Sequence, residues 1–191
     1  MSERILNLPN AISVLRLIAV PVVGWLILHQ RWEAACWLFL AAAVSDGLDG
    51  LLARWLNQMT QLGAALDSIA DKVLGLVTLV MLTQAGAIPL WVTLAILLRD
   101  SIIVLGALSY RGLAGHLDIH PTWLGKTHMA AEFILLTLVL AGLAQLLELG
   151  DLLLPLFITV FVIAVVSGVQ YVWIWSAKAR RARDAARFNR R

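Results

Sequence analysis

The chain has 191 residues, of which 61% are hydrophobic and 14% are charged, whereas a soluble domain is about half apolar and about a quarter charged. This excess of apolar residues excludes an ordinary soluble domain. The formal net charge is +3, but the segment 178–191 alone contains seven basic residues and one acidic residue. The basic character therefore belongs to the end of the chain, and no nucleic-acid-binding surface is expected.

Six apolar segments follow one another along the chain, each close to the roughly 20 residues that a helix needs to cross a bilayer. They span 11–29, 34–56, 62–85, 88–110, 122–147 and 152–177. They predict an all-α integral membrane protein, with a single six-helix transmembrane domain over 1–177 and a basic tail over 178–191. The first segment is interpreted as a retained helix, because no small-residue cleavage site follows it.

The basic residues indicate an orientation for this bundle. Six transmembrane helices place both termini on one side, and eleven Lys and Arg residues fall on that side, against Arg31 alone on the other. The positive-inside rule then predicts that both termini are cytoplasmic. Short loops and the absence of a targeting segment favour a multi-pass protein of a bacterial inner (plasma) membrane. The tail is expected to meet anionic lipid headgroups, or simply to solubilise this end.

Four aspartates interrupt the second and third apolar segments. Asp46 and Asp49 are three residues apart, and Asp67 and Asp71 are four apart, so each pair shares one face of its helix. A short turn between the helices lets the two faces converge near the cytoplasmic boundary. Such charges are costly inside a membrane and repel one another unless cations lie between them. Because all the ligands are carboxylates, the pattern favours two divalent ions, Mg²⁺ or Mn²⁺, which can clamp a phosphoryl group.

Small residues and one arginine accompany these carboxylates. Gly50 and Ala53 fall on or beside the face of the first pair, and Gly63 precedes the second pair by one turn. Each leaves space where a ligand can approach the helix backbone. Arg54 would add a phosphate-binding fork at the helix end. Taken singly, the glycines also suit close helix packing, and Arg54 also suits a snorkelling position.

The string D-x-x-D-G-x-x-A-R, followed after eight residues by G-x-x-x-D-x-x-x-D, resembles the signature of the CDP-alcohol phosphotransferase family. The stretch LPNAISVLR at 8–16, where the first segment begins, and the number of helices extend this similarity over most of the chain. The resemblance implies an enzyme with the six-helix fold of that family, usually a homodimer, that uses two divalent metals. It also implies cleavage of a CDP-linked alcohol with release of CMP.

Carried over residue by residue, the resemblance implies that Asp46, Asp49, Asp67 and Asp71 bind the metals. Asp71 would also act as the general base, accepting the proton of the acceptor hydroxyl while that oxygen attacks the lipid-linked β-phosphate. The residues implied to bind CDP or substrate are Gly50, Ala53, Arg54, Gly63, Asn10 and Ser13. Asn10 suits a helix cap equally well.

A different part of the chain indicates which alcohol is the acceptor. RDSIIVLGALSYR at 99–111 and LGK at 124–126 resemble the branch that makes cardiolipin or phosphatidylglycerol phosphate. The resemblance favours cardiolipin synthesis from CDP-diacylglycerol and phosphatidylglycerol, with glycerol 3-phosphate as the alternative acceptor. Both acceptors are anionic, and Arg99, Arg111 and Lys126 are the candidate acceptor-binding residues. Alternatively, Arg99 and its neighbour Asp100 pair independently with other helices, because adjacent helical residues do not face each other.

The sequence departs from the pattern of this branch at several positions. Met129 and Glu132 replace the last two marked residues of G-K-x-x-T-x-x-Q, and Ser68 stands where a proline is common. An acid at position 132 argues against phosphate binding beside it.

A further H-x-D-x-H run in the loop 111–121 consists of His116, Asp118 and His120. It is interpreted as a solvated loop or a headgroup contact, with a third metal site as the alternative. Two other classes of protein would also use intramembrane carboxylates. One is a divalent-cation channel or transporter, although no repeated halves with interrupted helices are visible. The other is an intramembrane hydrolase, against which the Gly, Ala and Arg positions favour a nucleotide-bearing donor.

Overall fold

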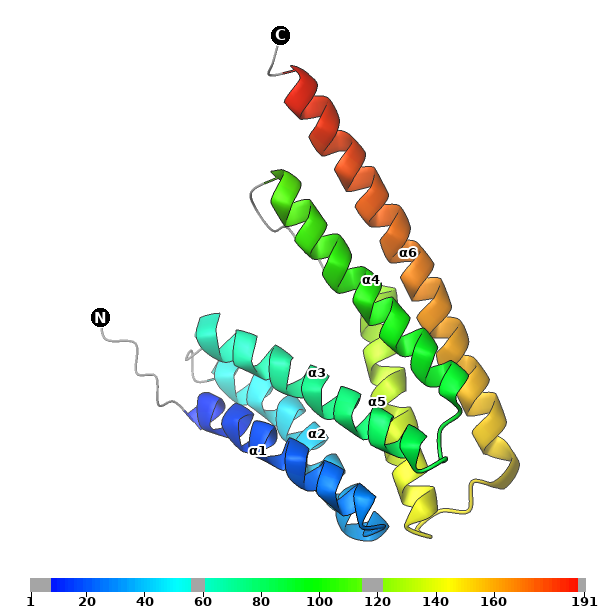
Figure 1. Cartoon of the computed structure of the whole chain (residues 1–191). Helices are drawn as coiled ribbons and strands as arrows, with labels where there is room; N and C mark the ends of the chain where they lie inside the picture. Colours follow the sequence, from blue (N-terminus) through cyan, green and yellow to red (C-terminus); the bar gives the residue numbers. More distant parts are fainter. Residues whose placement is uncertain (1–7, 56–60, 115–121, 189–191) are drawn as a thin grey trace. The chain divides into compact units, whose positions relative to one another are not determined.

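The computed structural model describes residues 8–55, 61–114 and 122–188, and over these ranges the chain is helical apart from short connections (Figure 1). The six predicted helices are confirmed. Their bounds are α1 (Leu8–Leu28), α2 (Trp32–Trp55), α3 (Gln61–Gln84), α4 (Leu90–Ala114), α5 (Trp123–Leu143) and α6 (Leu153–Phe188), with a short 3-10 helix, η1 (Gly150–Leu152), before α6.

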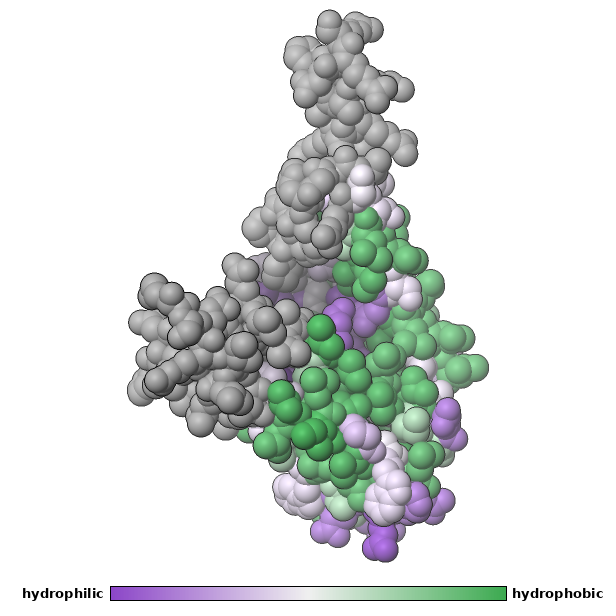
Figure 2. Space-filling view, turned by 60° about the vertical axis from the view of Figure 1, so that its left-hand side comes forward, coloured by the Kyte–Doolittle hydropathy of each residue, from purple (hydrophilic) through white to green (hydrophobic). Residues whose placement is uncertain are grey.

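Three helical stretches of the described chain are long and apolar enough to cross a membrane, namely Leu90–Tyr110, Trp123–Leu143 and Gly150–Lys178. Two shorter apolar stretches, Ser13–Leu28 and Trp32–Ser45, belong to α1 and α2. The six predicted membrane spans are thus confirmed only in part, for α4, α5 and α6. The face shown in Figure 2 is nevertheless predominantly hydrophobic over its described part.

Residues Met1–Ile88 and Glu132–Leu153 form one compact unit. Within it, α1, α2 and α3 lie side by side (Figure 1). Fully buried Val23, Phe39 and Leu74 come from these three helices in turn. A methyl group at Gly24 would lie 3.4 Å from Cγ1 of Val77, so α1 and α3 approach closely. These helices bury their apolar faces against one another, and this packing determines which side chains of α1 and α3 meet.

Helices α1, α3 and α5 end in the same kind of turn. In each, one residue adopts a left-handed backbone and the next amide donates a hydrogen bond to the carbonyl five residues earlier, as in the Schellman motif. The left-handed residues are Gln30 (φ 55°), Gly86 (φ 76°) and Gln145 (φ 57°), and the hydrogen bonds are Arg31–Leu26, Ala87–Leu82 and Leu146–Ala141, all 2.9 Å long. The first of these turns brings the chain sharply from α1 into α2.

Residues Pro89–Ala131 and Leu154–Arg191 form the second compact unit. Helices α4 and α6 lie along each other (Figure 1), with Trp91 edge-on to Phe161 at a centroid distance of 5.2 Å. Further along the pair, Tyr110 meets Trp175 at 5.7 Å. Helix α6 continues to Phe188, beyond the predicted end of its apolar segment at 177. The first part of the basic tail is therefore helical.

Candidate functional site

The aspartate pairs lie on α2 and α3, which are joined by only five residues and are consecutive in the first unit. Asp49 is six residues before the end of α2, and Asp67 is six residues after the start of α3. At 1.5 Å per residue, both are about 9 Å from the connected helix ends. The two pairs therefore lie equally far along α2 and α3 from the helix ends that the five residues connect.

Asp71 has a described side chain, whereas the side chains of the other predicted donor-site and metal-site residues of α2 and α3 lie outside the described residues. Those residues are Asp46, Asp49, Gly50, Ala53, Arg54, Gly63 and Asp67.

Asp71 is paired with an arginine of α1. Nη1 of Arg16 donates a hydrogen bond to Oδ1 of Asp71 over 2.6 Å. The two side chains are 1% and 13% exposed, respectively. This contact joins a guanidinium on α1 to a carboxylate on α3 by a charge-assisted hydrogen bond. Sequence reasoning gave Arg16 no role, although its charge within an apolar segment is the signal that could have found it.

The two predicted substrate residues on α1 precede Arg16. Ser13 is buried and lies three residues before Arg16, so the two share a helix face. Asn10 is the third residue of a helix that begins at Leu8, and so it is not the N-cap of α1. Its side chain lies outside the described residues.

The predicted metal ligands suit a hard divalent ion. All four predicted ligands are aspartates, and carboxylate oxygens are the ligands that Mg²⁺ and Mn²⁺ prefer. Within the described part of the chain, no three or more His, Cys, Asp or Glu side chains form a group that could bind a metal ion. Asp71 is the member of the predicted set whose side chain is described, and it is a partly buried carboxylate in an apolar unit.

Arg99 on α4 is buried in the second unit. Its Nη1 donates to Oδ1 of Asp100 over 2.6 Å, and its Nε donates to Oγ of Ser167 over 3.3 Å. The guanidinium carbon lies 5.7 Å from the centre of the Tyr171 ring. The alternative, in which Arg99 and Asp100 pair independently with other helices, does not hold for this pair, because Arg99 contacts both Asp100 and Ser167 of α6. The long arginine side chain bends back to its neighbour while α6 supplies a second contact.

The other two predicted acceptor residues differ from Arg99 in their surroundings. Lys126 on α5 is exposed, and its Nζ lies 5.6 Å from the centre of the Trp123 ring. A methyl group at Gly125 would lie 3.4 Å from Nη2 of Arg99, so the start of α5 approaches Arg99 closely. Arg111 is twelve residues after Arg99 on α4, about 18 Å along the helix, and its side chain lies outside the described residues.

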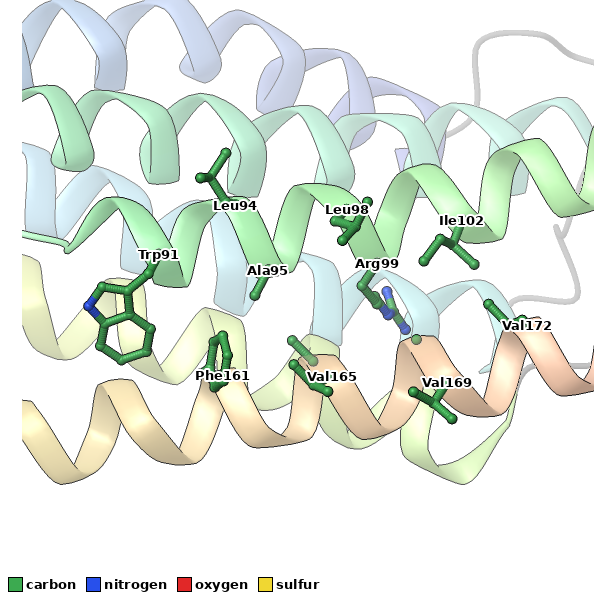
Figure 3. Close-up of a pocket in the computed structure, with 12 residues that line it drawn as sticks. Trp91, Leu94, Ala95, Leu98, Arg99, Ile102, Phe161, Val165, Val169 and Val172 are labelled. Atoms are coloured by element: carbon green, nitrogen blue, oxygen red, sulfur yellow. The ribbon is translucent and has the colours of Figure 1, made fainter.

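An apolar groove of about 510 Å³ runs beside Arg99 between α4 and α6 (Figure 3). Its hollow is bordered by large side chains such as Trp91 and Phe161 at one end and by Ala95 further along. Arg99 is the charged residue in its lining. The other residues that line it are Leu94, Leu98, Ile102, Ala164, Val165, Gly168, Val169 and Val172.

The remaining predictions concern residues away from this groove. Glu132 is buried in the first unit, where a methyl group at Gly75 would lie 3.5 Å from its Oε1. Met129 is exposed. The side chain of Ser68 lies outside the described residues, and so does the whole run His116, Asp118 and His120. Sequence reasoning also overlooked His128, which is fully buried in the second unit.

These features define a helical membrane protein with a carboxylate-bearing helix pair, and the family model for CDP-alcohol phosphatidyltransferase matches residues 6–170. The chain therefore belongs to the CDP-alcohol phosphatidyltransferase family. Members of this family generally depend on divalent metal ions, and the similar proteins described below are named as synthases or transferases. These names favour an enzyme over a cation channel.

The chain is similar to curated proteins with two different names. It is 36% identical over 153 residues to a cardiolipin synthase (CMP-forming) of Rattus norvegicus, with 71% of this chain and 50% of the relative covered. It is 38% identical over 145 residues to a CDP-diacylglycerol–glycerol-3-phosphate 3-phosphatidyltransferase of Pseudomonas fluorescens, with 72% of this chain and 73% of the relative covered.

A third relative is aligned over most of both chains. It is a probable phosphatidylglycerophosphate synthase of Mycobacterium tuberculosis, 33% identical over 189 residues, with 95% of this chain and 84% of the relative covered. By contrast, the chain spans about half the length of the mammalian cardiolipin synthases that it matches.

Proposed function

We propose that this protein transfers the phosphatidyl group of CDP-diacylglycerol to phosphatidylglycerol, giving cardiolipin and CMP. The observation that supports the transfer chemistry most directly is the family signature on two consecutive helices, with the last aspartate held by Arg16. In this proposal Asp46, Asp49, Asp67 and Asp71 hold two divalent ions, Mg²⁺ or Mn²⁺, which when bound would neutralise charge on the diphosphate.

The chain's own residues perform the remaining steps. The Asp71 carboxylate accepts the proton of the acceptor hydroxyl, whose oxygen forms a bond to the lipid-linked phosphorus. The bond from that phosphorus to the bridging oxygen breaks, and CMP leaves with the electron pair. Gly50, Ala53 and Gly63 leave space for the CDP group, and Arg54 donates to its phosphates. Asn10 and Ser13 bind the nucleotide end.

The groove beside Arg99 supports a lipid acceptor. Its lining is apolar apart from Arg99, and it lies between two helices that each contain a membrane-spanning stretch. An acyl chain suits such a lining, whereas glycerol 3-phosphate has no acyl chain to fill it. Arg99, together with Lys126 and Arg111, then binds the acceptor phosphate. The relatives named as cardiolipin synthases support the same choice of acceptor.

Glycerol 3-phosphate is the second candidate acceptor, which would make the protein a phosphatidylglycerolphosphate synthase. The alignment covers 73% of the Pseudomonas fluorescens transferase and 84% of the Mycobacterium tuberculosis synthase. It covers only 50% of the rat cardiolipin synthase.

The proposal also includes the arrangement of the chain in the membrane. All six helices form one catalytic domain over 1–177 with both termini on the cytoplasmic side of a bacterial inner membrane, and 178–191 is a basic tail. Two copies form a homodimer.

The test is CMP release by the purified full chain with CDP-diacylglycerol and Mg²⁺ or Mn²⁺, with phosphatidylglycerol in one reaction and glycerol 3-phosphate in another. Turnover with phosphatidylglycerol alone, abolished by EDTA, is the expected result. Turnover with glycerol 3-phosphate alone would replace the first candidate by the second. Release of CMP that needs neither alcohol would indicate hydrolysis and contradict both candidates.

A further inference from the structure

Arg16 is a buried charge that the proposed chemistry does not use. It lies on α1, outside the aspartate signature of α2 and α3, and its side chain is 1% exposed. Its Nη1 meets Oδ1 of Asp71 at 2.6 Å across 55 positions of sequence. The bond therefore joins two helices and is not a local contact within one helix.

The surroundings of this pair explain why the bond orients Asp71. On the same side of α1, the later residues Val20 and Val23 are buried and apolar, and at Gly24 the helix approaches Val77 of α3 closely. An arginine side chain is long and carries its charge at any ordinary pH. Packing of α1 on α3 therefore brings a permanent cation to a defined point on the Asp71 carboxylate.

We infer that Arg16 is a positioning residue for Asp71, whose guanidinium holds that carboxylate in the orientation in which it binds a divalent ion. The inference rests on the proposed metal-binding role of Asp71. An ionised carboxylate offers about four acceptor positions, so a bond from Arg16 is compatible with a bond to a metal. Partners that orient a metal ligand from behind typically change metal affinity by about 10- to 100-fold.

The experiment measures Mn²⁺ binding to the detergent-purified full chain from the electron paramagnetic resonance signal of free Mn²⁺. Four proteins are compared: the wild type, Arg16→Gln, Asp71→Asn and the double variant. Arg16→Gln is expected to raise the Kd for Mn²⁺ by about tenfold. In the Asp71→Asn background the same change should have little further effect, because a residue that acts through Asp71 has nothing left to orient.

Two results would overturn the inference about Arg16. One is an unchanged Mn²⁺ affinity of Arg16→Gln. The other is a loss of the same factor in both backgrounds, which would mean that Arg16 acts on the site without Asp71. If Asp71→Asn itself leaves Mn²⁺ binding unaltered, the proposed metal role of Asp71 fails and the inference fails with it. If only Asp71→Asn weakens binding, the metal role stands and the role of Arg16 falls.

Three further variants separate positioning from folding. Arg31→Gln removes an exposed arginine of the α1–α2 connection and should leave the Mn²⁺ Kd unchanged. Arg16→Lys keeps the charge without the planar fork and should lose less affinity than Arg16→Gln. Thermal unfolding in EDTA shows whether each variant folds. If Arg16→Gln does not fold, Arg16→Met, which fills the buried site with a flexible apolar chain, takes its place with the same expected tenfold loss.

Discussion

The two compact units each bury an arginine against an aspartate, but they use the pair differently. Both pairs have a contact of 2.6 Å. Arg16 contacts Asp71 on another helix, and the Asp71 side chain is 13% exposed. Arg99 contacts its neighbour in sequence, Asp100, and the Asp100 side chain is 35% exposed. The second helix in the Arg99 cluster contributes a hydroxyl, from Ser167, and an aromatic ring, from Tyr171.

This difference distinguishes the two sites chemically. In the first unit, the arginine faces a carboxylate of the family signature, so its charge acts on a group of the proposed transfer site. In the second unit, the arginine is anchored by a local carboxylate and by α6, beside an apolar groove. In the proposed function, the first arrangement would orient a carboxylate toward a metal ion, and the second would orient a guanidinium toward the phosphate of a lipid acceptor.

Asp71→Asn should produce the largest effect on catalysis. The amide cannot accept the acceptor's proton as a carboxylate does, and loss of a general base typically costs 10² to 10⁴ in rate. We expect CMP release to fall by about 10³-fold. Asp151→Asn, at an exposed aspartate of η1, is the matched control and should retain full activity. Near-normal turnover by Asp71→Asn would exclude this residue as the base.

Arg99→Lys should act on the acceptor and leave the donor unaffected. Lysine cannot reach Asp100 and Ser167 at once with a planar fork. We expect the KM for phosphatidylglycerol to rise by about tenfold, equivalent to about 1.4 kcal/mol, with the KM for CDP-diacylglycerol unchanged. Steady-state kinetics with each lipid varied in turn measures both constants, and Arg31→Lys serves as an exposed control. An equal rise of both constants would show that Arg99 supports the whole structure and not the acceptor.

Two glycines of α4 test the packing of the second unit independently of chemistry. A methyl group at Gly106 would come within 2.4 Å of the Trp175 ring, whereas one at Gly112 meets nothing within 4 Å. Gly106→Ala should therefore destabilise the protein by about 1 to 3 kcal/mol, while Gly112→Ala should be neutral or stabilise its helix by about 0.5 to 1 kcal/mol. Thermal unfolding in detergent compares them. Equal stabilities would mean that α4 and α6 do not pack closely at Trp175.

Much of this architecture could be predicted from the sequence because apolar length and charge spacing are local signals. The six helices, and the assignment of the aspartate pairs to two consecutive helices, follow from such signals. The partner of Asp71 does not, because it lies 55 residues away and depends on how α1 packs on α3. The pairing of Arg99 with Asp100 also escaped prediction. Helix geometry separates the Cβ atoms of adjacent residues, but a long guanidinium can still bend back to its neighbour.

The number of membrane spans is confirmed in part. Apolar length alone suggested six spans, but within the described ranges three stretches satisfy both the length and hydropathy requirements.

Ala95→Phe should produce the smallest effect and should depend on the acceptor. Ala95 lines the groove, so a phenyl ring there would fill space that an acyl chain requires (Figure 3). We expect the KM for phosphatidylglycerol to rise roughly threefold to tenfold, or about 0.7 to 1.4 kcal/mol, without any change for CDP-diacylglycerol. Leu108→Phe, at an exposed position of α4 outside the groove, controls for an added ring. An unchanged KM for phosphatidylglycerol in Ala95→Phe would show that the groove does not bind the acyl chain of the acceptor. Arg99 would then be the remaining candidate contact to the acceptor in the second unit.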